Sequence, residues 1–486
     1  MKGFVRLMAV VVTAAVFVVA CSKDKDSCKI TLDSPAVFFA QAGGSATVGF
    51  TAQNIKTLSA TSKPTGWDEA VVDLAGAMIS VKAPSSEDIE SGDAVKTGSF
   101  SFTGYTPGGT LVSATLFAGI VTTKDISAEV ANSYIVTEPE TNYLIDATRK
   151  GDGSQLATSY VDVVWQTASG FVQYADFEDG KASFYIGADS DDATKIKQGN
   201  AVIGAYDADG ELIWSWHIWA TDYDPDAEGG TVDFNGYTLM NRNLGALAND
   251  NSTTDKILAS YGLYYQWGRK DPFPHPATCQ DINKRADAVY AEGFEYAVSY
   301  PRNAGTESPY DNMTVEWSIA HPTTFMSDAM YEDWEEWTSV ADWLYNHHPN
   351  LWGNVTTSNN NISKVSLKSI YDPCPVGWKV PSPEDFAGIE RVSQSSPYYV
   401  TIHYNGNRTT NIPTGGTFVE TRFMNNGQLG RLYTNAPYNM HWGTWACRYG
   451  DISCTSIFFS TGSVPSFIGT TDYYRYAANP IRCIRE

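Results

Sequence analysis

Residues 30–121 alternate between apolar and polar positions in short runs. The clearest runs are 46–50, 78–82, 99–102 and 110–116, and clusters of Gly, Pro, Asn and Asp separate them. A period of two sends successive side chains to opposite faces of a strand, and such clusters are typical of turns. The pattern predicts a β-sandwich module at residues 30–125.

A second stretch of this kind predicts another β-sandwich module at residues 130–229. Its expected strands lie at 143–147, 161–165, 183–186 and 201–206. The last of them is followed by a turn at 207–210 that ends in Asp209-Gly210, and then by an apolar run at 212–219. Asp-Gly between two apolar runs is a strong hairpin signal, so we expect 212–219 to return beside 201–206.

From residue 234 onward the loops become longer and richer in Asn and Trp. Residues 328–344 place Trp334, Trp337 and Trp343 at roughly helical spacing among acidic residues, which predicts an amphipathic helix over the edge of a core. A stripe of Trp at this spacing favours packing over a ligand platform.

A second helix is expected to begin at Pro383. Ser382 is a suitable N-cap, and Asp385 stands at the third helical position. The residues that would face inward from this helix are Phe386, Ile389 and Val392.

The N-terminal residues have the pattern of a secretory signal. Lys2 and Arg6 precede an apolar run at 7–20, which is too short for a membrane-spanning helix. The run ends at Ala20-Cys21, which resembles a bacterial lipobox, in which the cysteine is lipidated after cleavage. We therefore expect a signal peptide at 1–20 and a lipidated tether at 21–29. Ordinary signal cleavage with an incidental Cys21 is the alternative.

Charge and composition narrow the class of protein further. The formal net charge of −22 becomes −24 once the two basic residues of the signal are removed, so nucleic acid is not expected as a partner. A length of 486 residues favours about three domains. The charged residues at 22–26 resemble the tracts that send lipoproteins of the Bacteroidetes phylum to the outer face of the outer membrane, where a lipid anchor would hold this chain.

Seven cysteines raise the question of disulfide bonds, because an exported protein usually oxidises its thiols. Cys374 stands between two prolines, and Cys483 lies in an alternating run near the C-terminus. A bridge between them would close a loop of about 110 residues and stabilise the fold by up to about 4.7 kcal/mol. Cys447 and Cys454 form a second candidate pair, because a short hairpin could bring them together. Cys28 and Cys279 are left unpaired or paired with each other.

Four ordered motifs carry a resemblance to a known family. Residues 239–246 (LMNRNLGA), 262–273 (GLYYQWGRKDPF), 372–378 (DPCPVGW) and 481–484 (IRCI) resemble the Fibrobacter succinogenes major paralogous domain. That family has a C-type-lectin-like fold and is common in Bacteroidetes surface lipoproteins. The resemblance implies an α+β lectin-like domain at 230–486 and a disulfide staple at Cys374 and Cys483.

Two weaker resemblances concern the segments before this domain. Residues 133–136 and 214–225 resemble a β module that often precedes it. Residues 64–67 and 79–84 resemble the Ig-like modules grouped with BACON domains, which usually act as spacers. The expected fold is therefore mainly β, with two Ig-like sandwiches followed by the lectin-like domain.

The family also implies structural roles for most motif residues. Arg242 and Arg269 are expected to pair with acids or backbone carbonyls inside the fold, with ligand contact as the alternative. Asn243 belongs to the same structural motif. Trp267 and Trp378 are expected in the core.

Signatures of metal or catalytic chemistry are weak. The seven histidines, including the 347–348 doublet, show no zinc pattern. Acidic residues alternate at 222–228 like the start of a calcium loop, yet the Gly and terminal Glu of an EF-hand are missing, so an interdomain turn is expected.

Catalytic motifs are missing from the sequence as well: no nucleophile elbow or P-loop occurs. We expect no cofactor and no catalytic residue. One enzyme alternative remains, a formylglycine-generating type of oxidase that uses Cys447 and Cys454.

Binding is the favoured function. The long loops before the last strands of a lectin-like fold typically recognise ligands, and here they are rich in aromatic and amide groups. Each ring taken singly could equally fill the core. The candidate ligand residues are Tyr438, His441, Trp442, Trp445, Tyr473 and Tyr474. The expected partner is a glycan or protein on a host or neighbouring cell, and the protein could serve as a fimbrial tip or accessory subunit that contacts other fimbrial subunits. A purely structural pilus or envelope component is the alternative.

Overall fold

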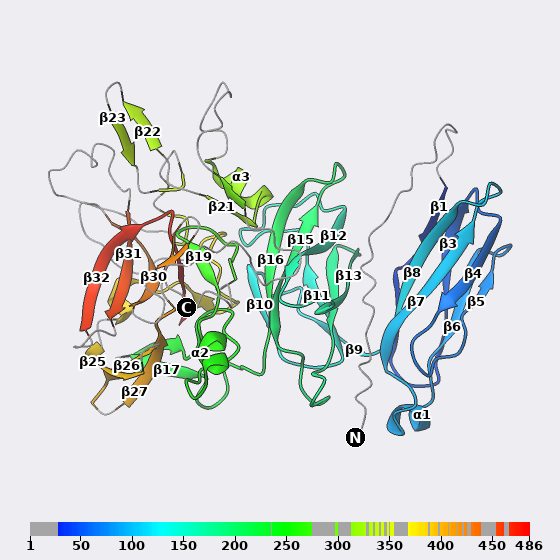
Figure 1. The fold of residues 1–486 in the computed structure, drawn as a ribbon, viewed down its shortest axis with the longest axis horizontal. Coiled ribbons are helices and arrows are strands. Elements are labelled where there is room, and N and C mark those ends of the chain that lie inside the picture. Colours follow the sequence, from blue (N-terminus) through cyan, green and yellow to red (C-terminus); the bar gives the residue numbers. More distant parts are fainter. Residues whose placement is uncertain are drawn as a thin grey trace, which may run out of the picture.

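Most of the chain consists of strands in the computed structural model. The residues that the structure describes are 28–274 except 235, and then 297–299, 313–326, 330–333, 336–339, 342–344, 348, 350–353, 368–386, 389–396, 399–406, 408–415, 417–419, 422–424, 429–438, 453–460 and 466–486. Two β-sandwiches and a larger C-terminal part, which we call the head, follow one another in a row (Figure 1). The predicted β-rich fold is confirmed.

The first sandwich packs two four-stranded sheets, of order β1-β3-β6-β5 and β2-β8-β7-β4. Its core contains Trp67, Phe100 and Phe102, all at most 1% exposed, and Trp67 Nε1 donates a hydrogen bond to Val95 O at 2.8 Å. The strands are β1 (Lys29–Leu32), β2 (Ala36–Phe39), β3 (Ser45–Gln53), β4 (Thr57–Ser62), β5 (Val71–Asp73), β6 (Met78–Lys82), β7 (Thr97–Tyr105) and β8 (Leu111–Ile120).

The second sandwich combines sheets of order β10-β16-β15-β12 and β13-β14-β11-β9. β15 and β16 pair antiparallel across residues 207–210, as the Asp-Gly turn predicts. Gly210 has φ +85°, a left-handed conformation that glycine adopts without strain. The strands are β9 (Thr122–Asp125), β10 (Ser133–Val136), β11 (Thr141–Asp146), β12 (Tyr160–Gln166), β13 (Val172–Glu178), β14 (Lys181–Ile186), β15 (Gly199–Tyr206) and β16 (Leu212–Ala220).

The passage from the first sandwich to the second is itself a strand. β9 begins two residues after β8 ends and pairs parallel with β11, so it is the edge strand of the second sandwich. Thr122 Oγ1 and Thr141 Oγ1 lie 3.0 Å apart in this pairing. The connection between the two modules is thus a strand that is hydrogen-bonded to the second sandwich, and not an open linker.

The head is built from several small sheets. One has the order β17-β18-β34-β24 and another the order β19-β33-β28-β29, while β25-β26-β27 and β30-β31-β32 form three-stranded sheets. The strands are β17 (Thr231–Phe234), β18 (Tyr237–Met240), β19 (Tyr264–Gln266), β20 (Ala297–Ser299), β21 (Thr324–Met326), β22 (Met330–Asp333), β23 (Glu336–Ser339), β24 (Trp378–Lys379), β25 (Ile389–Ser396), β26 (Tyr399–Tyr404), β27 (Arg408–Pro413), β28 (Thr417–Val419), β29 (Arg422–Met424), β30 (Leu429–Tyr438), β31 (Ser453–Ser460), β32 (Ser466–Tyr474), β33 (Ala478–Pro480) and β34 (Ile484–Arg485).

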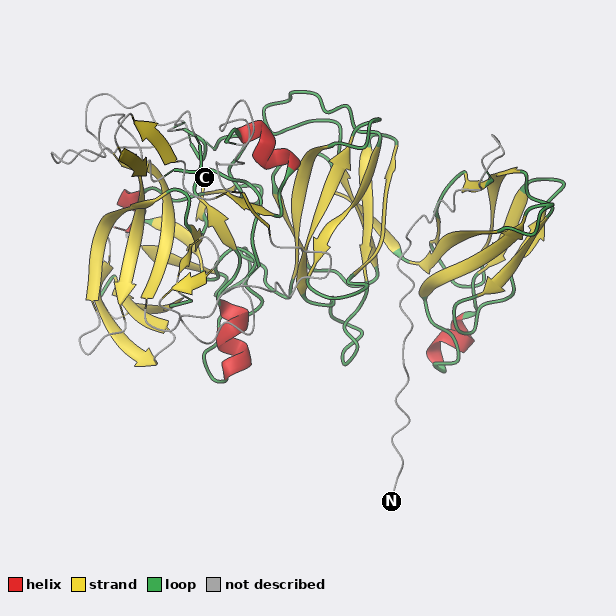
Figure 2. Ribbon diagram, turned by 45° about the horizontal axis from the view of Figure 1, so that its top comes forward, coloured by secondary structure: helices red, strands yellow, loops and turns green. Residues whose placement is uncertain are grey.

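The helices are short and lie at the margins of the strand layers (Figure 2). A hydroxyl caps each α-helix: Ser85, Thr253 and Thr314 accept a hydrogen bond from the backbone N–H three residues later. The helices are α1 (Ser86–Glu90), α2 (Thr254–Ser260), α3 (Val315–Ala320) and the 3-10 helix η1 (Pro383–Phe386).

The second sandwich and the head share one hydrophobic core. Trp165 and Trp219 of the sandwich belong to the same buried cluster as Trp267, Trp343 and Trp352 of the head. All five rings are at most 1% exposed. The end of the second module is therefore not a free surface but one side of the core of the head.

Two helix predictions are wrong. Residues 330–333 and 336–339 form the antiparallel strands β22 and β23 instead of parts of an amphipathic helix, with Met330 paired to Ser339. Only one 3-10 turn follows Ser382, whose N–H donates to Asp385 Oδ2 at 2.7 Å, and β25 begins at Ile389. At both places the pairing of strands, β22 with β23 and β25 with β26, overrides the local helix signal.

Candidate functional site

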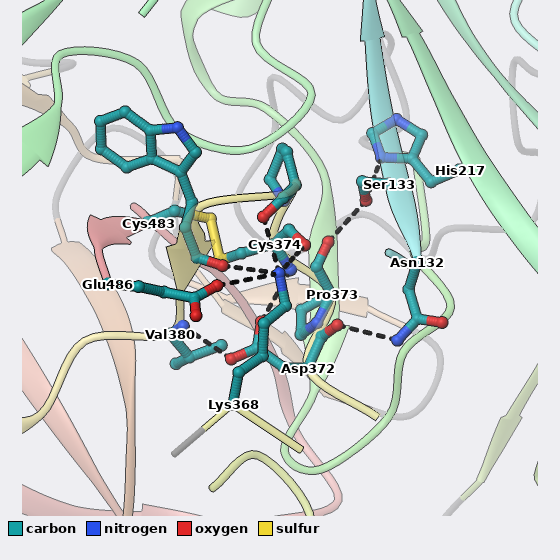
Figure 3. The surroundings of a disulfide bond; sticks show 12 residues. Asn132, Ser133, His217, Lys368, Asp372, Pro373, Cys374, Val380, Cys483 and Glu486 are labelled. Carbon is teal, nitrogen blue, oxygen red and sulfur yellow. Dashed lines mark hydrogen bonds and ion pairs between the residues drawn. A yellow bond between two sulfur atoms is a disulfide. The ribbon is translucent and has the colours of Figure 1, made fainter. Parts of the chain in front are cut away.

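A disulfide fastens the two ends of the head. Cys374 and Cys483 are bonded with their Cα atoms 6.0 Å apart, and 109 residues separate them in sequence. Both cysteines are completely buried (Figure 3). The predicted staple is confirmed, so Cys374 is neither a nucleophile nor a metal ligand.

Asp372 organises the turn that leads into the disulfide. Its Oδ1 accepts a hydrogen bond from Cys374 N at 2.8 Å and its Oδ2 accepts one from Val380 N at 2.9 Å. The carboxyl group is completely buried. Burial raises its pKa to about 6, although both N–H groups and the nearby Lys368 favour the charged form.

Lys368 holds the other side of this turn. Its Nζ donates to the carbonyl oxygens of Cys374, Pro375 and Trp378 at 2.8, 2.6 and 2.7 Å, and it lies 3.7 Å from Glu486 Oε1 (Figure 3). Burial lowers its pKa, while Asp372 and Glu486 favour the charged form. Three donated hydrogen bonds thus fix the backbone that follows the disulfide.

The same turn is bonded to the second sandwich. Asn132 Nδ2 donates to Ile370 O at 2.7 Å and to Asp372 O at 2.8 Å, while Ser133 Oγ donates to Pro373 O at 2.5 Å. These two residues stand at the start of β10, which places the sandwich directly against the disulfide (Figure 3).

A buried histidine extends this network into the sandwich. His217 Nδ1 lies 3.1 Å from Ser133 Oγ, and Nε2 lies 2.9 Å from Asn200 Oδ1. Asn200 Nδ2 in turn donates to Gly245 O at 3.0 Å. Complete burial lowers the pKa of His217 to about 3, so the imidazole is neutral at pH 7.

A second buried polar cluster joins the 262–273 motif to the sandwich. Lys270 Nζ lies 2.7 Å from Asp271 Oδ1 and donates to Ser215 O at 3.1 Å. Ser215 Oγ donates to Asp271 Oδ1 at 2.5 Å, and Lys270 Nζ lies 4.6 Å from the centre of the Trp214 ring. Sequence analysis missed this role, although adjacent opposite charges within an apolar motif are a signal of buried pairing.

Arg242 and Asn243 take different positions after β18. Arg242 is 16% exposed, and its guanidinium lies 3.2 Å from Asp222 Oδ1 at the edge of a surface cleft. Asn243 is completely buried, donates to Tyr261 O at 3.0 Å and accepts from Arg482 Nε at 3.0 Å. Burial lowers the pKa of Arg482 to about 10. Sequence analysis did not single out Arg482, although it directly precedes Cys483.

Arg269 lies in the core and donates to backbone oxygens. It reaches Thr324 O, Ser318 O and His321 O at 2.7, 3.2 and 3.1 Å, as well as Gln266 Oε1 at 2.9 Å. Burial lowers its pKa to about 10, which leaves the guanidinium charged. Its contacts order the segment around α3.

Both motif tryptophans are buried under arginines. The guanidinium of Arg475 lies 4.4 Å from the centre of the Trp267 ring and forms an ion pair with Asp342 at 3.0 Å. Arg485 covers Trp378 at 4.4 Å. Arg475 directly follows the candidate ligand residues Tyr473 and Tyr474, but its complete burial assigns it to the core.

The structure brings several candidate ligand residues to one end of the β30-β31-β32 sheet. Tyr438 pairs with Ser453, which pairs with Tyr474 in the next strand, and Cys454 pairs with Tyr473. Adjacent strands lie about 4.8 Å apart, so the backbones of Tyr438 and Tyr474 are about 10 Å apart in one row. Residues His441, Trp442, Trp445 and Cys447 lie outside the described residues.

Tyr474 is exposed to solvent at the end of this row. Its side chain is 48% exposed and stacks on Tyr476, with ring centres 5.2 Å apart and an interplanar angle of 18°. An equivalent pair lies on the second sandwich, where Tyr160, 42% exposed, stacks on Tyr206 at 4.8 Å. Stacking holds each ring in place before any ligand arrives.

The turn at residues 222–230 is bordered by two surface clefts. The larger has a volume of about 480 Å³ and includes Arg242, and the smaller has a volume of about 270 Å³ and includes Pro375 and Trp378 beside the disulfide. No three His, Cys, Asp or Glu side chains gather as metal ligands in the part of the chain that the structure describes. No helix within those residues is long and apolar enough to cross a membrane.

Comparison with known proteins gives no family for the chain. No family model and no curated protein matches it. Solved structures that it resembles include a tri-modular endo-beta-1,4-glucanase from Bacillus licheniformis (11% identity over 39% of this chain and 38% of that chain, TM-score 0.14) and the adhesin InvE of Yersinia pseudotuberculosis (11% identity, 48% and 79%, TM-score 0.14).

A third structure is the glucan-utilization protein SGBP-B of Bacteroides ovatus in complex with a mixed-linkage heptasaccharide (10% identity over 39% of this chain and 46% of that chain, TM-score 0.11). The chain spans less than half of the first and third of these proteins. Such TM-scores lie far below those of shared folds, so the function proposed below does not rest on them.

Proposed function

We propose that the protein is a cell-surface binding protein whose head contacts a glycan or protein ligand at the Tyr438–Tyr474 end of the β30-β31-β32 sheet. The observation that carries the proposal is the strand register, which puts Tyr438, Ser453 and Tyr474 in one row beside the exposed Tyr474 ring. Residues 439–452, with His441, Trp442 and Trp445, connect β30 to β31 and therefore begin and end at this row.

Exposed aromatic rings suit this task. Tyrosine offers a large apolar face and a hydroxyl that can bond to a ligand, and it loses little conformational entropy when it is already stacked. The Tyr474–Tyr476 pair meets this condition. Amide and hydroxyl groups of the same loops would set the orientation of the ligand.

Further parts of the proposal concern the whole chain. Cys21 would carry the lipid that anchors the protein to the outer face of the outer membrane. The first sandwich, with its likeness to BACON modules, would act as a spacer, and the lectin-like domain at 230–486 would be the ligand-binding head. Assembly with fimbrial subunits is a further part of the same hypothesis, and we propose no enzymatic activity.

A glycan array and a cell-adhesion assay test the binding function. The soluble chain of residues 22–486, which lacks the lipid anchor, is compared with Tyr474→Ala and Trp442→Ala. We expect saturable binding to a defined glycan or surface protein, weakened about tenfold or more by either variant, since stacking of a planar ligand group such as a base on one aromatic ring is worth about 1–3 kcal/mol.

The matched control is Tyr160→Ala, because that ring has similar exposure and stacking but lies on the second sandwich. Equal loss in the control and in Tyr474→Ala would contradict the assignment of the site. Capture of a fimbrial subunit without any glycan or host ligand would favour the structural alternative instead.

A further inference from the structure

A groove runs along the turn at residues 222–230, where the second sandwich meets the head. The larger cleft lies between this turn, Arg242 after β18 and the start of α2. The smaller cleft lies between the same turn, β10 and the residues that follow Cys374. Asp224 lines both clefts, so they adjoin at this residue, and we refer to the two clefts together as the groove.

Apolar side chains form part of the wall of the smaller cleft. They include Ile135, Pro225, Pro375 and Val376, of which Val376 is 41% exposed, whereas polar side chains line the rest of the cleft. The backbone of this wall is held by the Lys368 hydrogen bonds and the disulfide described above. Its volume of about 270 Å³ accommodates an aliphatic side chain.

The larger cleft is polar and carries an excess of negative charge. Arg242 is neutralised by Asp222 at 3.2 Å. Asp226, which lines the smaller cleft, pairs with Arg485. Asp224 and Glu228 make no ion pair within the described parts of the chain. The basic residue that remains is Lys256, which lies near Asp250 and contributes to lowering the pKa of that carboxyl.

We propose that this groove binds an extended, basic segment of a protein partner, with Lys or Arg side chains over Asp224 and Glu228 and an aliphatic side chain in the cleft beside Val376. Charge complementarity supports this occupant, because a chain of net charge −22 attracts basic partners over long range. In an extended segment every second side chain faces the same way, so the two kinds of side chain can enter the groove together.

This site is distinct from the Tyr438–Tyr474 row of the proposed function. It is built by the second sandwich, the 222–230 turn and the disulfide loop, whereas the row lies in the β30-β31-β32 sheet. Either site can therefore be lost without the other, and a failure of one proposal is recognised separately from a failure of the other.

The test uses the peptide acetyl-Val-Ser-Val-Ser-Lys-Ser-Lys-amide, in which Val and Lys share one face of an extended chain. Its binding to residues 22–486 is followed by NMR or calorimetry at low and high salt. We expect saturable binding at concentrations up to about 1 mM, weakened at high salt, and about tenfold weaker for Asp224→Asn/Glu228→Gln. Val376→Asp should weaken binding about as much, because it places a charge in the apolar cleft.

The matched control is Asp209→Asn/Glu211→Gln, which removes two exposed acids at the opposite end of β16 and should leave binding unchanged. Tyr474→Ala should also bind the peptide normally. Equal binding of a peptide with Glu in place of Lys, indifference to the groove variants, or the absence of saturable binding would overturn the proposal. A glycan that binds in this groove while the peptide does not would overturn it as well.

Discussion

The junction between the two sandwiches and the junction between the second sandwich and the head differ in their buried polar contacts. The first and second sandwiches meet through aromatic rings, where Tyr174 packs against Phe38 at 5.4 Å and Phe117 at 5.6 Å. An ion pair between Lys96 and Glu140 at 2.6 Å lies at the rim. The second sandwich meets the head through a shared apolar core and, in addition, through buried polar groups, among them Ser133 and His217.

The difference between the two junctions predicts which parts of the chain unfold together. Apolar contacts are non-directional, and each side of such a junction keeps a complete core of its own. A buried polar network leaves costly unpaired groups on both sides when it is opened, and here it accompanies a shared core around Trp165, Trp219 and Trp267. We therefore expect the first sandwich to unfold separately, and the second sandwich and head to unfold as one unit.

Removal of the disulfide should have the largest effect. Cys374→Ala/Cys483→Ala releases a loop of 109 residues, which on the chain-entropy model lowers the free energy of unfolding by up to about 4.7 kcal/mol. Calorimetry of residues 22–486 should show the transition of the sandwich–head unit at a lower temperature. The transition of the first sandwich is the internal control, and a matching shift there would contradict the separation of the two units.

Acid should weaken the second junction next. His217 has a folded pKa of about 3, below its usual value of 6.5, so its stabilising contribution is complete above pH 6.5 and is lost as pH falls toward 3. The loss should amount to roughly 3 kcal/mol at pH 4.5. No histidine precedes residue 217, so the first sandwich lacks this dependence.

The measurement compares unfolding of the wild type with that of His217→Gln between pH 7 and 4.5. Asp372 acts in the opposite direction, because its raised pKa makes the folded unit relatively more stable as pH falls from 6 to 4, and it cancels in this comparison. An equal pH dependence of the two proteins would exclude His217 as the sensitive group.

Truncation at the first junction should have a smaller effect. Tyr174→Ala removes two ring pairs, each worth about 0.5–1.5 kcal/mol, and so reduces the coupling between the sandwiches by about 2 kcal/mol. The variant should widen the distribution of distances between spin labels on the two sandwiches. Tyr160→Ala, on the same sandwich but away from the junction, serves as its control.

The rim ion pair should contribute least. Lys96 and Glu140 are 40% and 31% exposed, and such pairs are worth about 0–1 kcal/mol because water screens them. A double-mutant cycle with Lys96→Ala and Glu140→Ala should give a coupling energy below about 1 kcal/mol that disappears at high salt. A larger, salt-independent value would mean that this junction also has a polar component.

The sequence predicts the parts of the fold that depend on local pattern. The predicted runs match four of the eight strands of the first sandwich and five of the eight of the second, and the turn ending in Asp209-Gly210 identifies the β15–β16 hairpin. The edge strand β13 escapes this reading, although Val172 and Tyr174 are buried on either side of an exposed residue. The Trp spacing at 328–344 fails because β22 and β23 pair antiparallel with each other, and the spacing of rings alone does not separate such short strands from a helix.

The site is less predictable from the sequence, because several of its contacts join segments that are far apart along the chain. The Cys374–Cys483 bond follows from the motifs, but the backbone oxygen of Asp372 accepts from Asn132, 240 residues earlier, and His217 contacts Ser133, 84 residues earlier. Only the fold shows that Ser133 reaches Pro373, 240 residues later. Adjacent charges such as Lys270-Asp271 within an apolar motif are the one local sign of this network.

Hydrogen–deuterium exchange on Cys374→Ala/Cys483→Ala tests directly whether the second sandwich and the head unfold as one unit. If the disulfide, the polar network and the shared core form one unit, amide exchange rises in β10 and β16 of the second sandwich together with β24 and β34 of the head, while β3 and β7 of the first sandwich are unchanged. Faster exchange confined to the head, with β10 and β16 as protected as in the wild type, would mean that the second sandwich and the head are separate units.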